Sequence, residues 1–286
     1  MSTRSSNRTL RQGQMVNGYR LQKLLGVGTQ GAVWEVCNPT TRTTLAMKFQ
    51  KDHAEAAYEL EILRRVPNHP NVIKLFNSFV HGPYHVMALE FLGITLSEYL
   101  SKYGKISPRN TVRAGGQLTM GLKYLFDHGI MHRDFHGKNI AFDVKYEKLK
   151  ILDLGIGALT RTHRDNRPRY LFYLSPAAPV DVHRGAAYSN YSDMISLIWI
   201  LLDCRYIGSN VRDRNIGKMA EKKEKFLENP MSLLKPADSF LAPIVKQIYK
   251  NYHRHESYSS VLTAMKKAMP GLNFKTPFDK KGRRLE

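Results

Sequence analysis

The hydrophobic pattern changes once along this chain, and that change limits the folds available to it. Residues 19–91 contain short runs rich in β-branched and aromatic residues, such as YRLQKLLGVG, GAVWEVC and TTLAMKF, separated by turn residues. Beyond Gly93 the pattern is mainly helical, and the segment 107–129 opens with a Ser–Pro pair typical of a helix start. We therefore predict an α+β protein in which a small β-rich part precedes a larger α-rich part.

One helix is expected inside the β-rich part. The segment 53–66 has apolar residues at helical spacing, and Pro67 directly follows it. Two more strand-like runs, NVIKLFNSF and YHVMALEFL, complete the expected sheet. The residues predicted on or near the buried face of the helix are Ala56, Leu60, Ile62 and Leu63.

The length and composition describe an ordinary globular chain of 286 residues. Cys37 and Cys204 are too few for a disulfide scaffold, which favours a reducing compartment, and we expect the cytoplasm, the nucleus or both. The longest apolar run, MISLIWILL at 194–202, is much shorter than the ~20 residues of a membrane span, so it predicts a buried helix. We expect flexible basic tails at 1–18 and 271–286.

The charge balance is strongly basic. There are 44 Lys and Arg residues against 24 Asp and Glu, which gives a formal net charge of +20. Such an excess attracts polyanions, including acidic or phosphorylated proteins, nucleic acid and anionic membranes, and charge alone does not choose among them. Because no RNA- or DNA-binding motif accompanies the charge, a nucleic-acid-binding protein is the weakest of the hypotheses.

The first candidate site is the glycine-rich run GVGTQGAV at 26–33. Glycines let backbone amides approach phosphate oxygens with no side chain in the way. A dinucleotide-binding fold requires a helix after such glycines, whereas the residues that follow, AVWEVC, have a strand pattern. The run therefore favours a loop that folds over a nucleotide.

The second candidate is Lys48, seventeen residues after Gly31 and on the next predicted strand. An isolated lysine in a basic chain is usually surface charge. With the glycine loop before it and a glutamate on the following helix, Lys48 matches a lysine that holds nucleotide phosphates and is itself held by a carboxylate. Glu59 is the favoured partner, with Glu55 and Glu61 as alternatives.

The third candidate is the stretch IMHRDFHGKN at 130–139, taken with KILDLGIG at 150–157. Asp134 would accept or orient a hydroxyl proton, while Asn139 and Asp153 would supply metal-ligating oxygens. Any one of these residues alone would more often cap a turn or a helix. Four motifs in this order, at separations typical of one enzyme class, argue against coincidence.

These motifs together resemble those of eukaryotic protein kinases over roughly residues 19–270. The resemblance implies a bilobal fold with an N-lobe and hinge at 19–92 and a C-lobe at 93–270, and it implies ATP and Mg²⁺ as cofactors. The catalytic residues would be Lys48, Glu59, Asp134, His136 and Lys138, and the metal ligands Asn139 and Asp153. The residues expected to bind the nucleotide are Gly26, Val27, Gly28, Gly31, Val33, Ala46, Lys48, Leu89, Glu90, Leu92 and Ala141.

A narrower resemblance is to the casein kinase I family, including the tau-tubulin kinases and the short nematode forms. HVMALEFLGITLSEYL is similar to the hinge of that family and would place Leu89 at the gatekeeper, with Glu90 to Leu92 along the adenine. HRGAAYSNYSDMISLIWIL is similar to the segment that replaces Ala-Pro-Glu, so Asp193 would be the buried aspartate that supports the catalytic loop. The resemblance implies serine/threonine phosphorylation of acidic or already phosphorylated proteins.

The chain departs from that family at the catalytic loop. The family has lysine two residues after the catalytic aspartate, where this chain has His136, which is only partly charged near neutral pH at its reference pKa. Lys138 could supply this charge instead. The alternative interpretation is that Lys138 is a solvent-exposed loop residue with no role in catalysis. An inactive pseudokinase that acts as a scaffold therefore remains a competing hypothesis.

The loop before His183 carries a cluster of arginines that could bind phosphate. Arg169 is the residue most expected to contact such a phosphate, and Arg212 or Arg214, near Asn215, would assist it. The alternative is that these arginines form a solvent-exposed charged face with no binding role. Thr160 and Thr162 could be modified. The cluster consists of Arg161, Arg164, Arg167 and Arg169.

Overall fold

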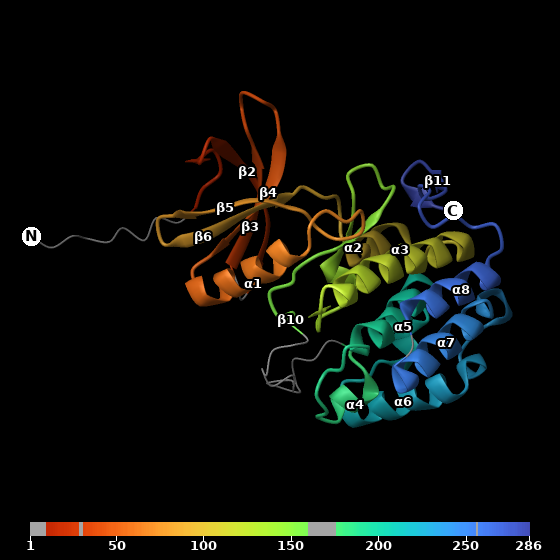
Figure 1. Ribbon diagram of the computed structural model, residues 1–286. Helices are drawn as coiled ribbons and strands as arrows, with labels where there is room; N and C mark the ends of the chain where they lie inside the picture. Colours follow the sequence, from red (N-terminus) through yellow and green to blue (C-terminus); the bar gives the residue numbers. More distant parts are fainter. Residues whose placement is uncertain (1–9, 29–30, 160–175, 256) are drawn as a thin grey trace, which may run out of the picture. The chain divides into compact units, whose positions relative to one another are not determined.

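The computed structural model describes residues 10–28, 31–159, 176–255 and 257–286 (Figure 1). The chain forms two compact units: residues Met1–Glu61 with Lys74–Phe91, and residues Ile62–Ile73 with Leu92–Glu286. The first unit is built on a β-sheet and the second is mainly helical, which confirms the predicted α+β class. The lobe boundaries at 92 and 93 stay a prediction; residues 62–73 group with the second unit.

The first unit contains a six-stranded sheet with the strand order β1-β2-β3-β4-β6-β5, in which each neighbouring pair is antiparallel. The predicted strands at 19–28 and 31–37 have those bounds, while the run 71–79 enters the sheet only from Leu75. The strands are β1 (Met15–Val16), β2 (Tyr19–Gly28), β3 (Gly31–Cys37), β4 (Thr44–Gln50), β5 (Leu75–His81) and β6 (Tyr84–Glu90).

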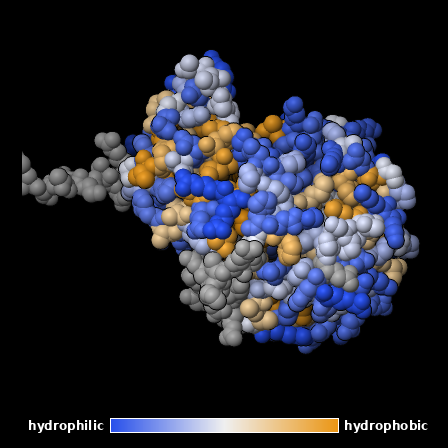
Figure 2. Space-filling model, in the orientation of Figure 1, coloured by the Kyte–Doolittle hydropathy of each residue, from blue (hydrophilic) through white to orange (hydrophobic). Residues whose placement is uncertain are grey.

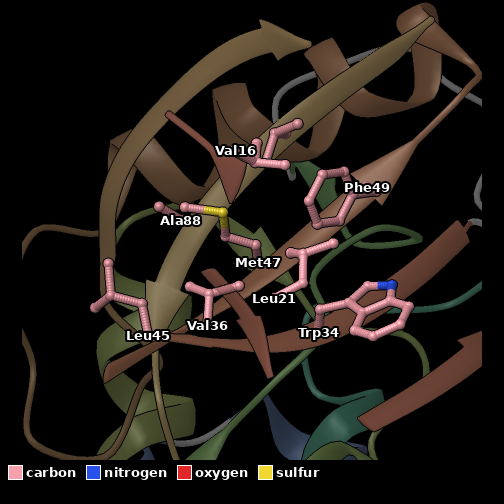
Figure 3. Packing of buried hydrophobic residues seen from close by; sticks show 9 residues of the cluster. Val16, Leu21, Trp34, Val36, Leu45, Met47, Phe49 and Ala88 are labelled. Carbon is pink, nitrogen blue, oxygen red and sulfur yellow. The ribbon is translucent and has the colours of Figure 1, made fainter. Parts of the chain in front are cut away.

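A hydrophobic cluster covers one face of this sheet (Figure 3). Trp34 and Val36 alternate on β3 with less buried neighbours, as expected for a sheet with one face in the core. Val16 is only 1% exposed and its strand pairs with β2, so the predicted flexible tail is wrong for residues 10–18. Residues 1–9 lie outside the described part of the chain. Figure 3 labels Val16, Leu21, Trp34, Val36, Leu45, Met47, Phe49 and Ala88.

Helix α1 (His53–Arg65) confirms the helix expected inside the β-rich part. Asp52 caps its start, because its Oδ1 accepts hydrogen bonds from the backbone N–H groups of Ala54 and Glu55. The four predicted apolar residues are all buried, and they are Ala56, Leu60, Ile62 and Leu63.

The second unit is built from helices and three short β-pairs. Ser107 caps α3 by accepting a hydrogen bond from the Asn110 N–H, and α5 contains the predicted buried run 194–202. Among the described residues, no helix is long and apolar enough to span a membrane. The helices are α2 (Leu96–Tyr103), α3 (Pro108–Asp127), α4 (Val180–His183), α5 (Ser192–Cys204), α6 (Ile216–Glu228), α7 (Leu241–Arg254) and α8 (Tyr258–Ala268). The β-pairs are β7 (Ile130–Met131) with β10 (Ala158–Leu159), β8 (Ile140–Phe142) with β9 (Leu149–Ile151), and β11 (Lys280–Lys281) with β12 (Arg284–Leu285).

The carboxyl-terminal segment packs against the second unit, so the predicted loose tail is wrong over 274–286. Phe278 and Leu285 are each 3% exposed, and the Leu285 N–H donates to the Tyr99 hydroxyl at 2.7 Å. Asn110 of α3 donates to the carbonyl oxygens of Asp279 and Glu286, each at 2.7 Å. The basic residues of this segment indicated a loose tail, whereas its apolar residues, such as Phe278 and Leu285, are buried.

The surface drawn in Figure 2 is mainly hydrophilic, with hydrophobic residues in separate patches. Large apolar side chains that are exposed include Val27 in the glycine loop, at 73%, and Val80 on β5, at 63%. Scattered exposed apolar residues of this kind are ordinary in proteins.

Candidate functional site

Lys48 and Glu59 form a buried ion pair in the first unit. The Lys48 Nζ lies 2.8 Å from both carboxylate oxygens of Glu59, and the two residues are 7% and 2% exposed. Gln50 also donates to Glu59, at 3.1 Å. Glu59 is thus the carboxylate that contacts Lys48, whereas Glu55 and Glu61 are exposed. The pair fixes an ammonium group on β4.

The glycine loop connects β2 to β3. Its third glycine, Gly31, has φ +138°, and a Cβ there would lie 2.0 Å from the Phe49 carbonyl oxygen on β4. Only glycine fits that position. A Cβ at Gly26 or Gly28 would meet no described residue within 4 Å, so packing against the described part of the chain does not require glycine at these two positions. Because the residues after the loop form a strand, a dinucleotide-type helix start is excluded.

The residues predicted around the adenine lie on β4, β6 and β8. Ala46 on β4 is the direct partner of Leu89 on β6, and Glu90 ends β6. Leu92 is the first residue of the longer segment of the second unit, and Ala141 is buried on β8. Ala46 and Leu89 are both 7% exposed, so the pair gives the sheet a small apolar surface next to Lys48.

A buried aspartate fixes the loop 130–139, here called the catalytic loop. The Asp193 carboxylate accepts hydrogen bonds from the backbone N–H groups of His132, at 2.6 Å, and Arg133, at 2.9 Å. Asp193 is 5% exposed, and Arg133 has a left-handed backbone with φ +69°. The predicted support of this loop by Asp193 is confirmed. The two bonds hold a backbone conformation that is otherwise unfavourable.

Asp134 is held from two sides. Asn139 donates from Nδ2 to the backbone oxygen and to Oδ2 of Asp134, each at 3.0 Å. The His136 Nε2 lies 3.2 Å from Asp134 Oδ1, while its Nδ1 accepts from the Lys138 N–H at 3.2 Å. Since Nδ1 accepts, we assign the proton of a neutral His136 to Nε2, from which it is donated to Asp134.

These contacts keep Asp134 ionised. Burial acts to raise the pKa of the Asp134 carboxyl, but the hydrogen bond and charge of His136 oppose it, followed by His132 and Asn139. The pKa is lowered overall. An aspartate in this state can accept a hydrogen bond from a hydroxyl group.

Asn139 and Asp153 lie at the same end of the β8–β9 pair. The Leu152 N–H donates to the Asn139 carbonyl oxygen at 2.9 Å, and Asp153 follows with φ +51°. Asn139 uses its amide nitrogen toward Asp134, which leaves its side-chain oxygen available as a ligand. Carboxylate and amide oxygens suit Mg²⁺. Within the described ranges no group of three or more His, Cys, Asp or Glu side chains could hold a metal alone.

The four arginines at 161, 164, 167 and 169 lie outside the described residues, as do Thr160 and Thr162. Arg212 pairs with the Asp203 carboxylate, and Asn215 caps α6. Lys138 is exposed.

The sequence reasoning missed two neighbours of the site. Gln50 lies two residues after Lys48, so strand alternation places both on one face of β4, and this spacing could have predicted the contact of Gln50 with Glu59. Tyr188 lies with its ring centroid 5.4 Å from the Arg133 guanidinium carbon. No local signal connects these two residues, which are far apart in the sequence.

Comparisons with known proteins show what this chain is similar to. The family model described as protein kinase domain matches residues 19–267. A putative serine/threonine-protein kinase of Caenorhabditis elegans, K06H7.1, is 26% identical over 90% of this chain and 79% of its own length. A carbon catabolite-derepressing protein kinase of Candida glabrata is 29% identical over 52% of this chain and 25% of its own length. CBL-interacting protein kinase 11 of rice is 31% identical over 53% of this chain and 32% of its own length.

The chain spans a quarter to a third of the Candida and rice proteins, whereas the family model covers most of this chain. The match includes the glycine loop, Lys48, the catalytic loop and Asp153. On this basis the chain belongs to the protein kinase family.

Proposed function

We propose that this protein is an ATP-dependent serine/threonine kinase of casein kinase I type. The observation that carries the proposal is the environment of Asp134, whose carboxylate is held by Asn139 and His136 on a loop fixed by Asp193. A carboxylate that is ionised, oriented and partly accessible can accept the hydrogen bond of a substrate hydroxyl.

The first unit supplies groups that suit ATP. The glycine loop would bind phosphate oxygens through backbone amides, since the absence of Cβ atoms at Gly26 and Gly28 leaves space above the loop. Lys48, held by Glu59, would bind the α- and β-phosphates. Leu89, Ala46 and Ala141 would contact the adenine.

The second unit supplies oxygen ligands for a divalent ion, which we propose to be Mg²⁺. Asn139 and Asp153 are too few to complete its coordination. Mg²⁺ usually keeps several waters and binds through one or two carboxylates together with substrate phosphates, so this small set fits. A bound Mg²⁺ would neutralise charge on the phosphates during transfer.

In the proposed reaction Asp134 orients the acceptor hydroxyl toward the γ-phosphorus. The bond between the hydroxyl oxygen and phosphorus forms, the bond to the β-phosphate oxygen breaks, and ADP leaves. Asp134 takes the hydroxyl proton during or after transfer. His136 and Lys138 would supply the positive charge that a lysine provides in the casein kinase I family.

The substrate class rests on the sequence resemblance and on charge. A net charge of +20 favours acidic or phosphorylated protein substrates. Arg169 and its neighbouring arginines would bind the acidic groups. We further propose lobes at 19–92 and 93–270 and a cytoplasmic or nuclear location.

The second candidate is a pseudokinase that acts as a scaffold. It is favoured by the contact of His136 with Asp134, since the imidazole occupies one of the carboxylate oxygens that a substrate would use. It is opposed by the presence of Lys48, Glu59, Asn139 and Asp153 in one chain.

A transfer assay separates the two candidates. Radiolabelled ATP, Mg²⁺ and casein are incubated with the wild type and with Asp134→Asn. We expect label in casein from the wild type and a loss of at least 100-fold in the variant, roughly the effect of removing one transition-state contact. Equal incorporation by the two proteins would refute the catalytic proposal, and ATP binding without any transfer would support the scaffold.

A further inference from the structure

A lysine buried in the second unit has a place in no step of the proposed reaction. Lys223 on α6 is 0% exposed, although four of the eight residues from Lys218 to Lys225 are charged and exposed on the same helix. Lys223 shares its helix face with Met219 and Phe226, which are also buried. Burial of a lysine ammonium costs free energy unless its donors are satisfied.

Among the described residues, the groups that contact the Lys223 ammonium come from outside α6. Its Nζ donates to the Ala178 carbonyl oxygen at 2.7 Å and lies 3.1 Å from the His183 Nε2. It also lies 4.6 Å from the ring centroid of Trp199 on α5. Within the described ranges no carboxylate oxygen forms an ion pair with it. The ammonium is therefore bound by neutral groups.

The tautomer of His183 follows from this contact. An ammonium group only donates, so His183 is neutral and accepts at Nε2, which places its own proton on Nδ1. Nδ1 is buried and has no hydrogen-bond partner among the residues that the structure describes. Lys223 thus binds two points of one short segment, Ala178 just before α4 and His183 at its end. Figure 1 shows α4 and α6 in the same region of the second unit.

This segment leads to the catalytic loop through packed side chains. Ala178, Val182 and Tyr188 form a buried hydrophobic cluster. The Tyr188 ring lies under the Arg133 guanidinium, 5.4 Å from its carbon, and the next residue is Asp134. Every step of this path consists of contacts within the second unit.

We propose that Lys223 is a positioning residue, which clamps Ala178 and His183 so that Tyr188 supports the catalytic loop beside Arg133. This inference rests on the proposed kinase function and extends it to a residue that touches neither nucleotide nor acceptor. The clamp sets the geometry of Asp134 toward the protein acceptor. It leaves the ATP-binding groups of the first unit, Lys48 and Glu59, unaffected.

The test is a double-mutant cycle with Lys223→Met, His183→Leu and the double variant. Methionine keeps the unbranched chain of lysine and loses the ammonium. We expect each single change to raise the KM for casein about 10-fold, as for one lost buried hydrogen bond, with the KM for ATP unchanged. The double variant should be no worse than Lys223→Met alone, since both changes remove the contact between Lys223 and His183. His183→Gln, which can still accept a hydrogen bond, should recover most of the loss.

The neighbouring residues provide a matched control. Arg184, directly after α4, forms an ion pair with Glu224 of α6 at 2.8 Å, but their side chains are 53% and 40% exposed. Arg184→Gln should leave both KM values within about 2-fold of the wild type, because exposed ion pairs contribute little. If Lys223→Met lowers the melting temperature but leaves the KM for casein unchanged, or changes both KM values equally, the clamp is only structural and the proposal is wrong.

Hydrogen exchange separates failure of this inference from failure of the proposed function. If the wild type transfers no phosphate, the kinase proposal fails. The rate of amide exchange in residues 130–139 and 176–188 then tests whether Lys223 positions the catalytic loop. Faster amide exchange than the wild type in both segments of Lys223→Met, but not of Arg184→Gln, supports the positioning role of Lys223. Unchanged amide exchange at 130–139 in Lys223→Met overturns this role.

Discussion

His136 Nε2 lies 3.2 Å from Asp134 Oδ1 and provides a hydrogen bond to the aspartate expected to orient the substrate. The residue that departs from the casein kinase I pattern is therefore in direct contact with the proposed catalytic group. It lowers the pKa of Asp134, against the effect of burial, which raises it.

Removal of this imidazole should change the pH dependence of the reaction. Asp134 must be ionised to act, and its lowered pKa keeps it ionised into acid. In His136→Ala the hydrogen bond is lost while burial remains, so the pKa of Asp134 should rise and the acid limb of kcat/KM should move to higher pH. The profile is measured with casein for both proteins. An acid limb that does not move would show that the contact has no effect on the ionisation of Asp134.

The source of positive charge near the transferred phosphate can be located by substitution. We expect His136→Lys to raise kcat, since it supplies a fixed charge, and Lys138→Ala to lower it by up to about 100-fold, within the range of a single electrostatic contact. The KM for ATP and the melting temperature serve as controls. An unchanged kcat in Lys138→Ala would refute the role of that lysine.

The glycine loop offers a matched pair of variants. Gly31→Ala places a Cβ 2.0 Å from the Phe49 carbonyl at φ +138°, so the two strands must separate, at a cost of roughly 1–3 kcal/mol in the free energy of unfolding. The Cβ of Gly28→Ala meets no described residue within 4 Å, so this change should leave that free energy unchanged, while it raises the KM for ATP. Thermal unfolding and ATP titration measure the two effects. Equal melting temperatures for the two variants would contradict this assignment.

The buried His183 predicts a loss of stability in acid. Burial, followed by the charge of Lys223, lowers the pKa of His183 from 6.5 to about 4. The neutral form is favoured in the folded protein, so the stabilisation is complete above pH 6.5 and is lost as the pH falls toward 4, by about 3 kcal/mol at most. Urea unfolding at several pH values measures this slope, and His183→Gln should reduce it. An identical slope in that variant would assign the acid sensitivity to other groups.

The carboxyl-terminal segment should contribute to folding. Phe278 is 3% exposed, so Phe278→Ala should lower the free energy of unfolding by about 3–5 kcal/mol. Lys281 is exposed three residues later, and Lys281→Ala should change it by less than about 0.5 kcal/mol. Urea unfolding of the two variants compares them directly, and similar midpoints would indicate a segment that is loose in solution.

Local patterns determined much of the fold. The strands at 19–28 and 31–37 and the helices at 53–65 and 108–127 follow from alternation, helical spacing and capping, which depend only on neighbouring residues. The residue types and order of the glycine loop, Lys48, the catalytic loop and Asp153 were sufficient to predict a protein kinase, because phosphate, metal and proton transfer each require specific groups.

Only the tertiary structure decided the contacts between distant segments. The rotation of α1 against β4 selects Glu59 as the partner of Lys48 from three nearby glutamates. The packing of 274–286 depends on its contacts with Tyr99 and Asn110. In the sequence Lys223 looks like the exposed lysines beside it, and only the contacts with Ala178 and His183 show that it is buried. Charge and hydrophobic periodicity are properties of a single segment of the sequence. Whether a residue of that segment is buried depends on which other segment packs against it in the folded protein.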